Sequence, residues 1–206
     1  MKFDGKNIGL TLSGGGTKGI AHAGVLKFID EIGLRPNHIA GTSSGAIVSS
    51  LYAWGKKPEE ILEFFKSIYF FHWKHFTLRK PGFIDSSAFR DYFHNIFGDA
   101  TLGELPYKMH LTATDLVSGK LRIFGDEIKI ADAVLASSAF PGIISPYEIE
   151  GRLYGDGGIV NHFPTDILQG RCDTNIGIYV SPIQKIQKED LSSIKAVPTR
   201  AYGLRS

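Results

Sequence analysis

Two glycine-rich turns, each lying between a short apolar strand and a helix, constrain the fold of this chain more than any other feature. Residues 8–12 form an apolar run that ends at a serine and three glycines, and helical spacing of apolar residues follows over 20–32. Residues 37–40 read as a second strand, which leads through another glycine turn into the helical pattern of 44–54. Strand, helix, strand and helix within about 50 residues predict a βαβα unit and a parallel sheet.

The rest of the chain extends this alternation. Helices are expected over 58–65, 86–97 and 130–137, strands over 108–115 and 121–124, a hairpin over 147–155, and a last core strand over 175–180. The sequence therefore predicts one α/β domain over residues 1–206, with the motif-bearing part at about 8–180. Residues 184–206 are polar, so the chain ends either in a loosely packed tail or before a final helix.

Composition excludes several classes of protein. The 206 residues carry a net charge of +2, which gives no support to nucleic-acid binding driven by overall charge. The one cysteine, Cys172, allows no internal disulfide. There is no signal-peptide pattern, no membrane-length apolar run and no acidic cluster with calcium-loop spacing, so we expect a cytoplasmic protein without a metal or cofactor. The oligomeric state stays open.

The second turn carries the first candidate for chemistry. Residues 41–45 read GTSSG, a Gly-x-Ser-x-Gly motif between a predicted strand and a predicted helix. In that context the motif indicates a nucleophile elbow, with Ser43 as the nucleophile and Gly41 and Gly45 giving room for a sharp turn. The following helix directs its N-terminus at the reacting centre, which favours developing negative charge. A glycine- and serine-rich turn without chemistry is the alternative.

The first turn, residues 13–19 (SGGGTKG), suits two functions. A dinucleotide-binding fold uses such a loop to approach a pyrophosphate, and an acyl hydrolase uses its N–H groups as an oxyanion hole. The nucleotide fold needs an acidic residue at the end of the second strand, where this chain has 40–43 (AGTS). A P-loop is excluded because Gly19, and not Ser or Thr, follows Lys18. The oxyanion-hole interpretation remains.

A serine nucleophile needs a base. Seven histidines are present, at positions 22, 38, 72, 75, 94, 110 and 162, and none lies in a marked turn after a late strand. Asp156, in residues 154–158 (YGDGG), is the better candidate because three glycines hold it on a tight, accessible turn. A plain Asp-Gly hairpin turn explains the same residues equally well.

Three motifs now stand in order, namely 14–19 (GGGTKG), 41–45 (GTSSG) and 156–158 (DGG), and together they resemble the patatin-like phospholipase family. The segments 112–115 (TATD), 136–141 (ASSAFP) and 156–164 (DGGIVNHFP) add to this resemblance, which covers about residues 8–180. It implies a three-layer α/β/α fold with a mostly parallel central sheet. It also implies a Ser43–Asp156 dyad without histidine, and an oxyanion hole formed by Gly14, Gly15 and Gly16.

The resemblance assigns supporting positions to Lys18, Gly19, Gly41, Gly45, Gly157 and Gly158. Lys18 would orient the glycine loop or meet an anionic head group, or would remain a solvated lysine. The implied activity is hydrolysis of lipid acyl esters, of phospholipase A or esterase type, through an acyl-enzyme. A non-catalytic lipid-binding or regulatory module of the same fold, and an oxidoreductase that uses the glycine loop, are the alternatives.

The dyad poses a chemical difficulty, because a free aspartate has a pKa of about 3.9 and is a poor base for serine. We therefore expect burial or a short hydrogen bond to compensate at Asp156. A separate feature is the aromatic stretch 64–76 (FFKSIYFFHWKHF), which suits either a helix packed in the core or a lid that makes transient contact with a membrane surface.

Overall fold

The computed structural model describes residues 5–75, 86–183, 185–193 and 196–204. Its centre is a sheet whose strands are β1 (Ile8–Leu12), β2 (His38–Thr42), β3 (Lys108–Asp115), β4 (Leu121–Ile123), β5 (Tyr147–Ile149), β6 (Arg152–Asp156) and β7 (Thr174–Ile178). The strand order is β5-β6-β3-β2-β1-β7, and β4 also pairs with β3. Strands β3, β2, β1 and β7 are parallel, whereas β4 and β6 run antiparallel to β3 and β5 runs antiparallel to β6.

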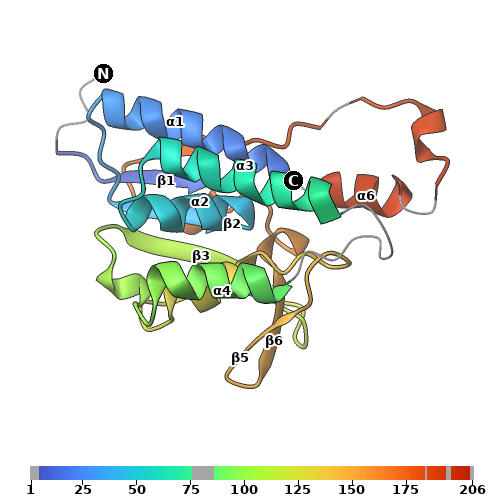
Figure 1. Ribbon diagram of the computed structural model, residues 1–206. Coiled ribbons are helices and arrows are strands. Elements are labelled where there is room, and N and C mark those ends of the chain that lie inside the picture. Colours follow the sequence, from blue (N-terminus) through green and yellow to red (C-terminus); the bar gives the residue numbers. More distant parts are fainter. Residues whose placement is uncertain (1–4, 76–85, 184, 194–195, 205–206) are drawn as a thin grey trace.

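Helices follow the strands as the sequence pattern predicts. They are α1 (Ile20–Glu31), α2 (Ser44–Ala53), α3 (Pro58–His75), α4 (Ser86–Phe97), α5 (Ile130–Ser137) and α6 (Ala196–Gly203). Short 3₁₀ turns are η1 (Gly16–Gly19), η2 (Leu102–Glu104), η3 (Gly157–Ile159), η4 (Asp166–Leu168) and η5 (Lys188–Leu191). Figure 1 shows α1 to α4 gathered in front of the strands, and the β5–β6 hairpin projecting below them.

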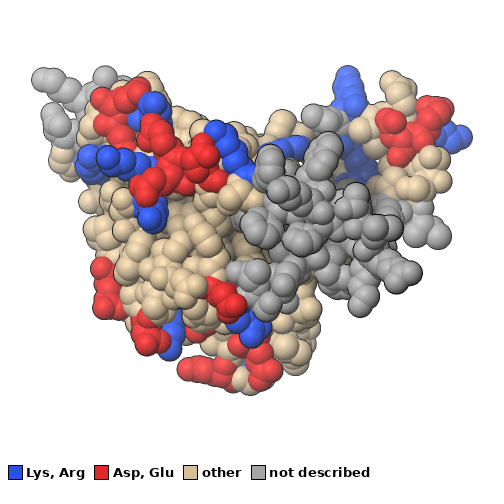
Figure 2. Space-filling model, viewed as in Figure 1, with Lys and Arg blue, Asp and Glu red and all other residues tan. Residues whose placement is uncertain are grey.

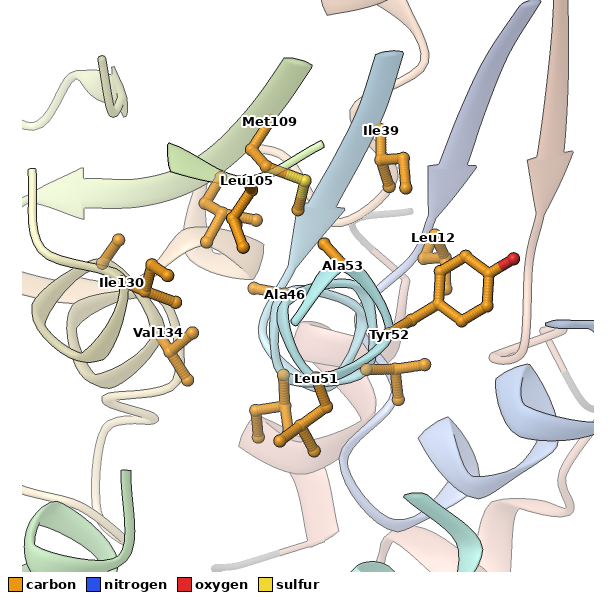
Figure 3. Packing of buried hydrophobic residues seen from close by; sticks show 14 of the residues in the cluster. Leu12, Ile39, Ala46, Leu51, Tyr52, Ala53, Leu105, Met109, Ile130 and Val134 are labelled. Atoms are coloured by element: carbon orange, nitrogen blue, oxygen red, sulfur yellow. The ribbon is translucent and has the colours of Figure 1, made fainter. Parts of the chain in front are cut away.

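One large apolar cluster joins α1 to α5 to the sheet. Every residue of α2 is buried, because this helix lies between β2 on one side and α3 and α5 on others. Figure 3 shows α2 nearly end-on, with Ile130 and Val134 of α5 beside it and Ile39 of β2 behind it. The opposite face of the sheet is covered at Ala40 by a smaller cluster with Ile167 and Leu168, at η4. The buried central helix fixes where β2 ends and therefore where Ser43 lies.

The prediction of an α/β fold around a central sheet is confirmed. The last strand differs from expectation, because β7 is an edge strand with half-buried side chains and not a core strand. It has a neighbour, β1, on one side only, so its residues lack the cover that β2 and β3 receive. The polar tail contains η5 and α6, drawn in red at the right of Figure 1.

The aromatic stretch begins in the core. Phe64 and Phe65 on α3 are buried, and the ring of Phe64 stacks on Tyr92 and meets Phe93 edge-on, both from α4. The core interpretation therefore holds for these two residues. The side chains of residues 68–76 lie outside the described part of the chain, so the lid and membrane interpretations stay predictions.

The surface in view carries both signs of charge. Figure 2 shows basic and acidic side chains interspersed at the upper and lower margins, with an uncharged area between them. Exposed ion pairs occur among the described residues, such as Lys27 with Glu59, which links α1 to α3. No helix among the described residues has the length and apolar character needed to cross a membrane.

Candidate active site

Ser43 occupies the sharp turn between β2 and α2. Its φ of 54° lies in the left-handed region, which an L-residue adopts at a cost of about 1–3 kcal/mol. Its backbone N–H donates a hydrogen bond to Ser137 Oγ over 2.9 Å, from the last residue of α5. A hydrogen bond to a second helix therefore holds the strained turn in place.

The two glycines of the motif are required by close backbone approach. A Cβ at Gly45 would lie 2.3 Å from the carbonyl oxygen of Leu12, at the end of β1. A Cβ at Gly41 would lie 2.8 Å from the carbonyl oxygen of Gly45. Side chains at these positions would push β1, β2 and α2 apart, so the turn at Ser43 needs glycine at both.

Asp156 lies at the end of β6 and reaches Ser43 directly. The Ser43 hydroxyl donates a hydrogen bond to Asp156 Oδ2 over 2.6 Å, and the Gly158 N–H donates to Oδ1 over 2.7 Å. The main chain of Asp156 is also held, because its carbonyl accepts from the Thr114 hydroxyl and its N–H donates to the carbonyl of Ala139. Hydrogen bonds therefore hold both the carboxylate and the main chain of Asp156 in place.

Burial makes this carboxylate unusually basic. Asp156 is only 2% exposed, and burial raises its pKa to about 6, although the hydrogen bonds from Ser43 and Gly158 act in the opposite direction. This is the compensation that the sequence argument requires, since the charged form is disfavoured where water is excluded. A carboxyl with a pKa near 6 is ionised at neutral pH and still accepts a proton far better than a free aspartate.

The other supporting glycines also lie at close contacts. A Cβ at Gly157 would lie 2.5 Å from the carbonyl oxygen of Thr112 on β3. A Cβ at Gly19 would lie 2.4 Å from Ser44 Cβ, at the start of α2. The glycine loop and the Asp-Gly-Gly turn are therefore both packed against the elements that carry the nucleophile.

The glycine loop differs from expectation in one donor. The Gly14 N–H donates to the carbonyl of His162 over 2.9 Å, so it is already engaged. Within the described chain, the N–H groups of Gly15 and Gly16 donate no hydrogen bond, and Gly16 is exposed. Lys18 is exposed and makes no ion pair with any described residue. The loop therefore offers two open donors and not three.

His22 anchors the start of this loop. It is fully buried on α1, and its Nε2 lies 2.9 Å from the carbonyl oxygen of Ser13. Burial lowers the pKa of His22 to about 4, against the effect of the bond to Ser13. The ring is therefore neutral at pH 7, and it acts as a structural support and not as a base.

His22 gives a prediction for acid stability. An unfolded histidine has a pKa of about 6.5, so the lowered folded value stabilises the protein above pH 6.5, and this stability is lost as pH falls towards 4. We expect the free energy of unfolding of wild type to fall by about 2–3 kcal/mol between pH 7 and pH 4.5 because of His22. Urea denaturation of wild type and His22→Gln at both pH values measures it. Identical pH dependence in the two proteins would contradict the assignment.

No described histidine ring is hydrogen-bonded to Ser43. His38 and His110 pair with each other, ring nitrogen to ring nitrogen, over 3.0 Å, on β2 and β3. His94 lies beside Asp132, with 3.9 Å between Nε2 and Oδ1. The described residues also contain no cluster of three or more His, Cys, Asp or Glu side chains that could hold a metal ion.

Three residues near the site are not predicted from the sequence as functional residues. They are Ser137, which holds the Ser43 N–H, His22, which holds Ser13, and His162, whose carbonyl holds Gly14. For His22 a signal was present, since it shares one helical face with Leu26 and Ile29, which are also buried. Ser137 and His162 lie in segments that resemble the family, 136–141 and 156–164, but their contacts with Ser43 and Gly14 are tertiary and do not follow from those segments.

Comparison with known proteins places these motifs in a wider group. A family model described as patatin-like phospholipase matches residues 10–168. An uncharacterized NTE family protein of Mycobacterium tuberculosis is 33% identical over 184 residues, which cover 83% of this chain and 48% of the relative. Patatin-like phospholipase domain-containing protein 6 of Mus musculus is 30% identical over 179 residues, which cover 79% of this chain and 12% of that protein.

The fold has a solved counterpart. The crystal structure of VipD from Legionella pneumophila aligns with a TM-score of 0.55 and 18% sequence identity, over 75% of this chain and 46% of that one. The chain spans about half the length, or less, of the curated relatives it matches. The likeness to VipD concerns the arrangement of the sheet and helices.

Proposed function

The chain belongs to the patatin-like phospholipase family, and from this premise we propose that it hydrolyses lipid acyl esters with Ser43 as nucleophile and Asp156 as base. The observation that carries the proposal is the 2.6 Å hydrogen bond from Ser43 Oγ to a carboxylate that is almost completely buried. Serine hydroxyls are common at turns, but a hydroxyl aligned on a basic carboxylate at a strained turn has the arrangement of an activated nucleophile.

The proposed reaction has two halves. Asp156 accepts the Ser43 proton as Oγ attacks the ester carbonyl, which gives a tetrahedral intermediate with a negatively charged oxygen. The C–O bond to the leaving alcohol then breaks, and the alcohol takes the proton from Asp156. In the second half Asp156 accepts a proton from water, the hydroxide attacks the acyl-Ser43 ester, and the proton returns to Ser43 as the fatty acid leaves.

The oxyanion needs donors that are fixed before the reaction. Gly15 and Gly16 suit this role because their N–H groups are not used elsewhere in the described chain. The start of α2 directly follows Ser43, so the partial positive charge of the helix N-terminus adds to the stabilisation. Gly14 contributes the position of the loop and not a donor, since its N–H is bound to His162.

The raised pKa predicts the pH dependence of activity. Asp156 must be ionised to accept the serine proton, so kcat/KM should fall tenfold per pH unit below about pH 6 and level off above it. Hydrolysis of a soluble p-nitrophenyl ester between pH 4.5 and 8.5 measures this profile. Since His22 loses its stabilising effect over the same range, circular dichroism at each pH should show that the protein remains folded. An acid limb of the profile, that is a fall in kcat/KM, centred near pH 4 would contradict the assignment.

The substrate class rests on the family, and a panel of substrates tests it. We expect fatty-acid release from phospholipid vesicles and from mono- and diacylglycerols, with the same Ser43 dependence for each. Hydrolysis confined to water-soluble esters would restrict the proposal to a general esterase.

We also propose that the described chain forms one domain, because a single core cluster joins β1 to α5 and β6.

A further inference from the structure

His162 lies between two glycine motifs that are far apart in the sequence. A Cβ at Gly14 would lie 2.8 Å from His162 Cε1 and 2.9 Å from its Nδ1. A Cβ at Gly158 would lie 3.0 Å from the same Nδ1. One imidazole ring therefore fills the space beside the glycine loop and beside the Asp156 turn.

Backbone conformation does not explain these two glycines. Neither Gly14 nor Gly158 has a positive φ, so each position could hold a side chain if there were room. The other neighbour of a Gly14 Cβ would be Ser43 Cβ at 3.4 Å, an ordinary contact, and that of a Gly158 Cβ would be Asp156 Oδ1 at 3.0 Å. The ring of His162 is thus the main reason that Gly14 carries no side chain.

The backbone of His162 strengthens the link. Its carbonyl accepts the Gly14 N–H over 2.9 Å, so main chain and side chain both contact the first glycine of the loop. A methyl group at Gly14 would touch the His162 ring and Ser43 together. The ring is therefore close to the nucleophile, although Ser43 Oγ itself is bonded to Asp156.

The ring acts by occupying space and not by titrating. Burial lowers the pKa of His162, and Lys18 adds to the lowering while the Gly14 backbone opposes it, so the ring is neutral at pH 7. Its Nε2 is buried without a hydrogen-bond partner in the described chain, beside the ring of Tyr179, whose hydroxyl is likewise unpaired there. Nε2 makes no hydrogen bond to a described residue, so packing and the interaction of the ring with the Gly14 backbone hold the ring in place.

We propose that His162 is a positioning residue, whose ring is the spacer that sets the glycine loop at the working distance from the Ser43–Asp156 dyad. The inference rests on the proposed function, because the distance matters for stabilising an oxyanion that forms on the ester carbonyl. Oxyanion donors are effective only within a few tenths of an ångström of their ideal place. A loop that shifts by about 1 Å loses roughly 100-fold in rate.

The first test replaces the ring. His162→Ala should lower kcat for a soluble ester about 10- to 100-fold with KM nearly unchanged, because the loop acts on the transition state. His162→Phe keeps a flat ring in the same place and should retain much more of the kcat than the alanine variant. Equal losses in the two variants, or a loss confined to KM, would overturn the spacer role.

The second test is a double-mutant cycle. Gly14→Ala should lower kcat because its new methyl group collides with the ring, and adding His162→Ala should recover at least tenfold of that loss by removing the obstacle. Gly15→Ala is the matched control, since its Cβ would meet Val180 Cγ2 at 2.6 Å and Ser181 Oγ at 3.0 Å, but not His162. The inference would be overturned if the losses of Gly14→Ala and His162→Ala were additive. It would also be overturned if His162→Ala restored the kcat of Gly15→Ala as much as that of Gly14→Ala.

Melting temperatures of the same variants separate this inference from the proposed function. If wild type hydrolyses no ester, the proposed function fails, but the packing still predicts that His162→Ala partly restores the stability lost in Gly14→Ala. The spacer role is supported if adding His162→Ala raises the melting temperature of Gly14→Ala but not that of Gly15→Ala. Additive changes in melting temperature at Gly14 overturn it whatever the activity.

Discussion

Replacing Ser43 with alanine is expected to lower kcat for ester hydrolysis by at least about 10⁴-fold, because no acyl-enzyme can form without the hydroxyl. The fold should persist, since the variant loses one hydroxyl and keeps the Ser43 N–H bond to Ser137 as a backbone interaction. The measurement is the initial rate on a soluble ester and on phospholipid vesicles. Both rates should fall together if one site acts on both substrates.

Ser50→Ala is the matched control for this variant. Ser50 lies on α2, the helix that follows Ser43, and its hydroxyl is buried without a hydrogen-bond partner in the described chain. Its loss removes a polar atom from the core and should leave both rates within about twofold of wild type, since the site is untouched. Full activity in Ser43→Ala would show that another residue is the nucleophile.

Replacing Asp156 with asparagine should lower kcat by about 10³- to 10⁴-fold, because a neutral amide cannot accept the serine proton. The amide has almost the same shape, so its oxygen can still accept the Gly158 N–H that the carboxylate now accepts. The acid limb of the pH profile should disappear from the residual rate. A residual rate that kept the limb near pH 6 would show that another group titrates.

The same variant should be more stable than wild type at high pH. The folded pKa of Asp156, about 6, lies above the unfolded value, so the carboxyl stabilises the fold below about pH 4, and this stability is lost as pH rises through 6. A difference of about 2 pKa units corresponds to about 3 kcal/mol. In urea denaturation at pH 8, the free energy of unfolding of Asp156→Asn should exceed that of wild type by up to about this amount. At pH 4 the two free energies should be equal.

A wild type that is more stable than Asp156→Asn at pH 8 would contradict this account of the buried carboxylate. It would mean that the hydrogen bonds from Ser43 and Gly158 outweigh the cost of burial. The predicted sign is the opposite, because burial has the largest effect on the pKa of this group. Opposite effects on activity and stability are expected where a charge is buried for chemistry.

The sheet explains how two distant motifs meet. Asp156 is 113 residues from Ser43, yet β2 and β6 are both neighbours of β3, so their ends lie at the same region of the sheet. The strand–turn–helix pattern around Ser43 was sufficient to predict the elbow, because local spacing fixes it. The pairing with Asp156 came from the family resemblance, since the antiparallel placement of β6 depends on tertiary contacts.

Other features were beyond the sequence for physical reasons. The family resemblance implies an oxyanion donor at Gly14, whereas its N–H is bonded to the carbonyl of His162. The contact of Ser137 with Ser43 depends on the end of α5 reaching the turn after β2, which the sequence of its own segment, 136–141, does not reveal. The half-buried state of β7 follows from its place at the edge of the sheet, which an apolar run alone does not reveal.

The most direct test of the Ser43–Asp156 dyad is covalent trapping with a fluorophosphonate, followed by peptide mass mapping. Attack by an activated serine displaces fluoride and leaves a phosphonate ester on that oxygen. The account predicts one adduct, on the peptide that contains Ser43, with labelling abolished in Ser43→Ala and slowed at least about 100-fold in Asp156→Asn. An adduct on another residue, or labelling of Asp156→Asn at the wild-type rate, would contradict it.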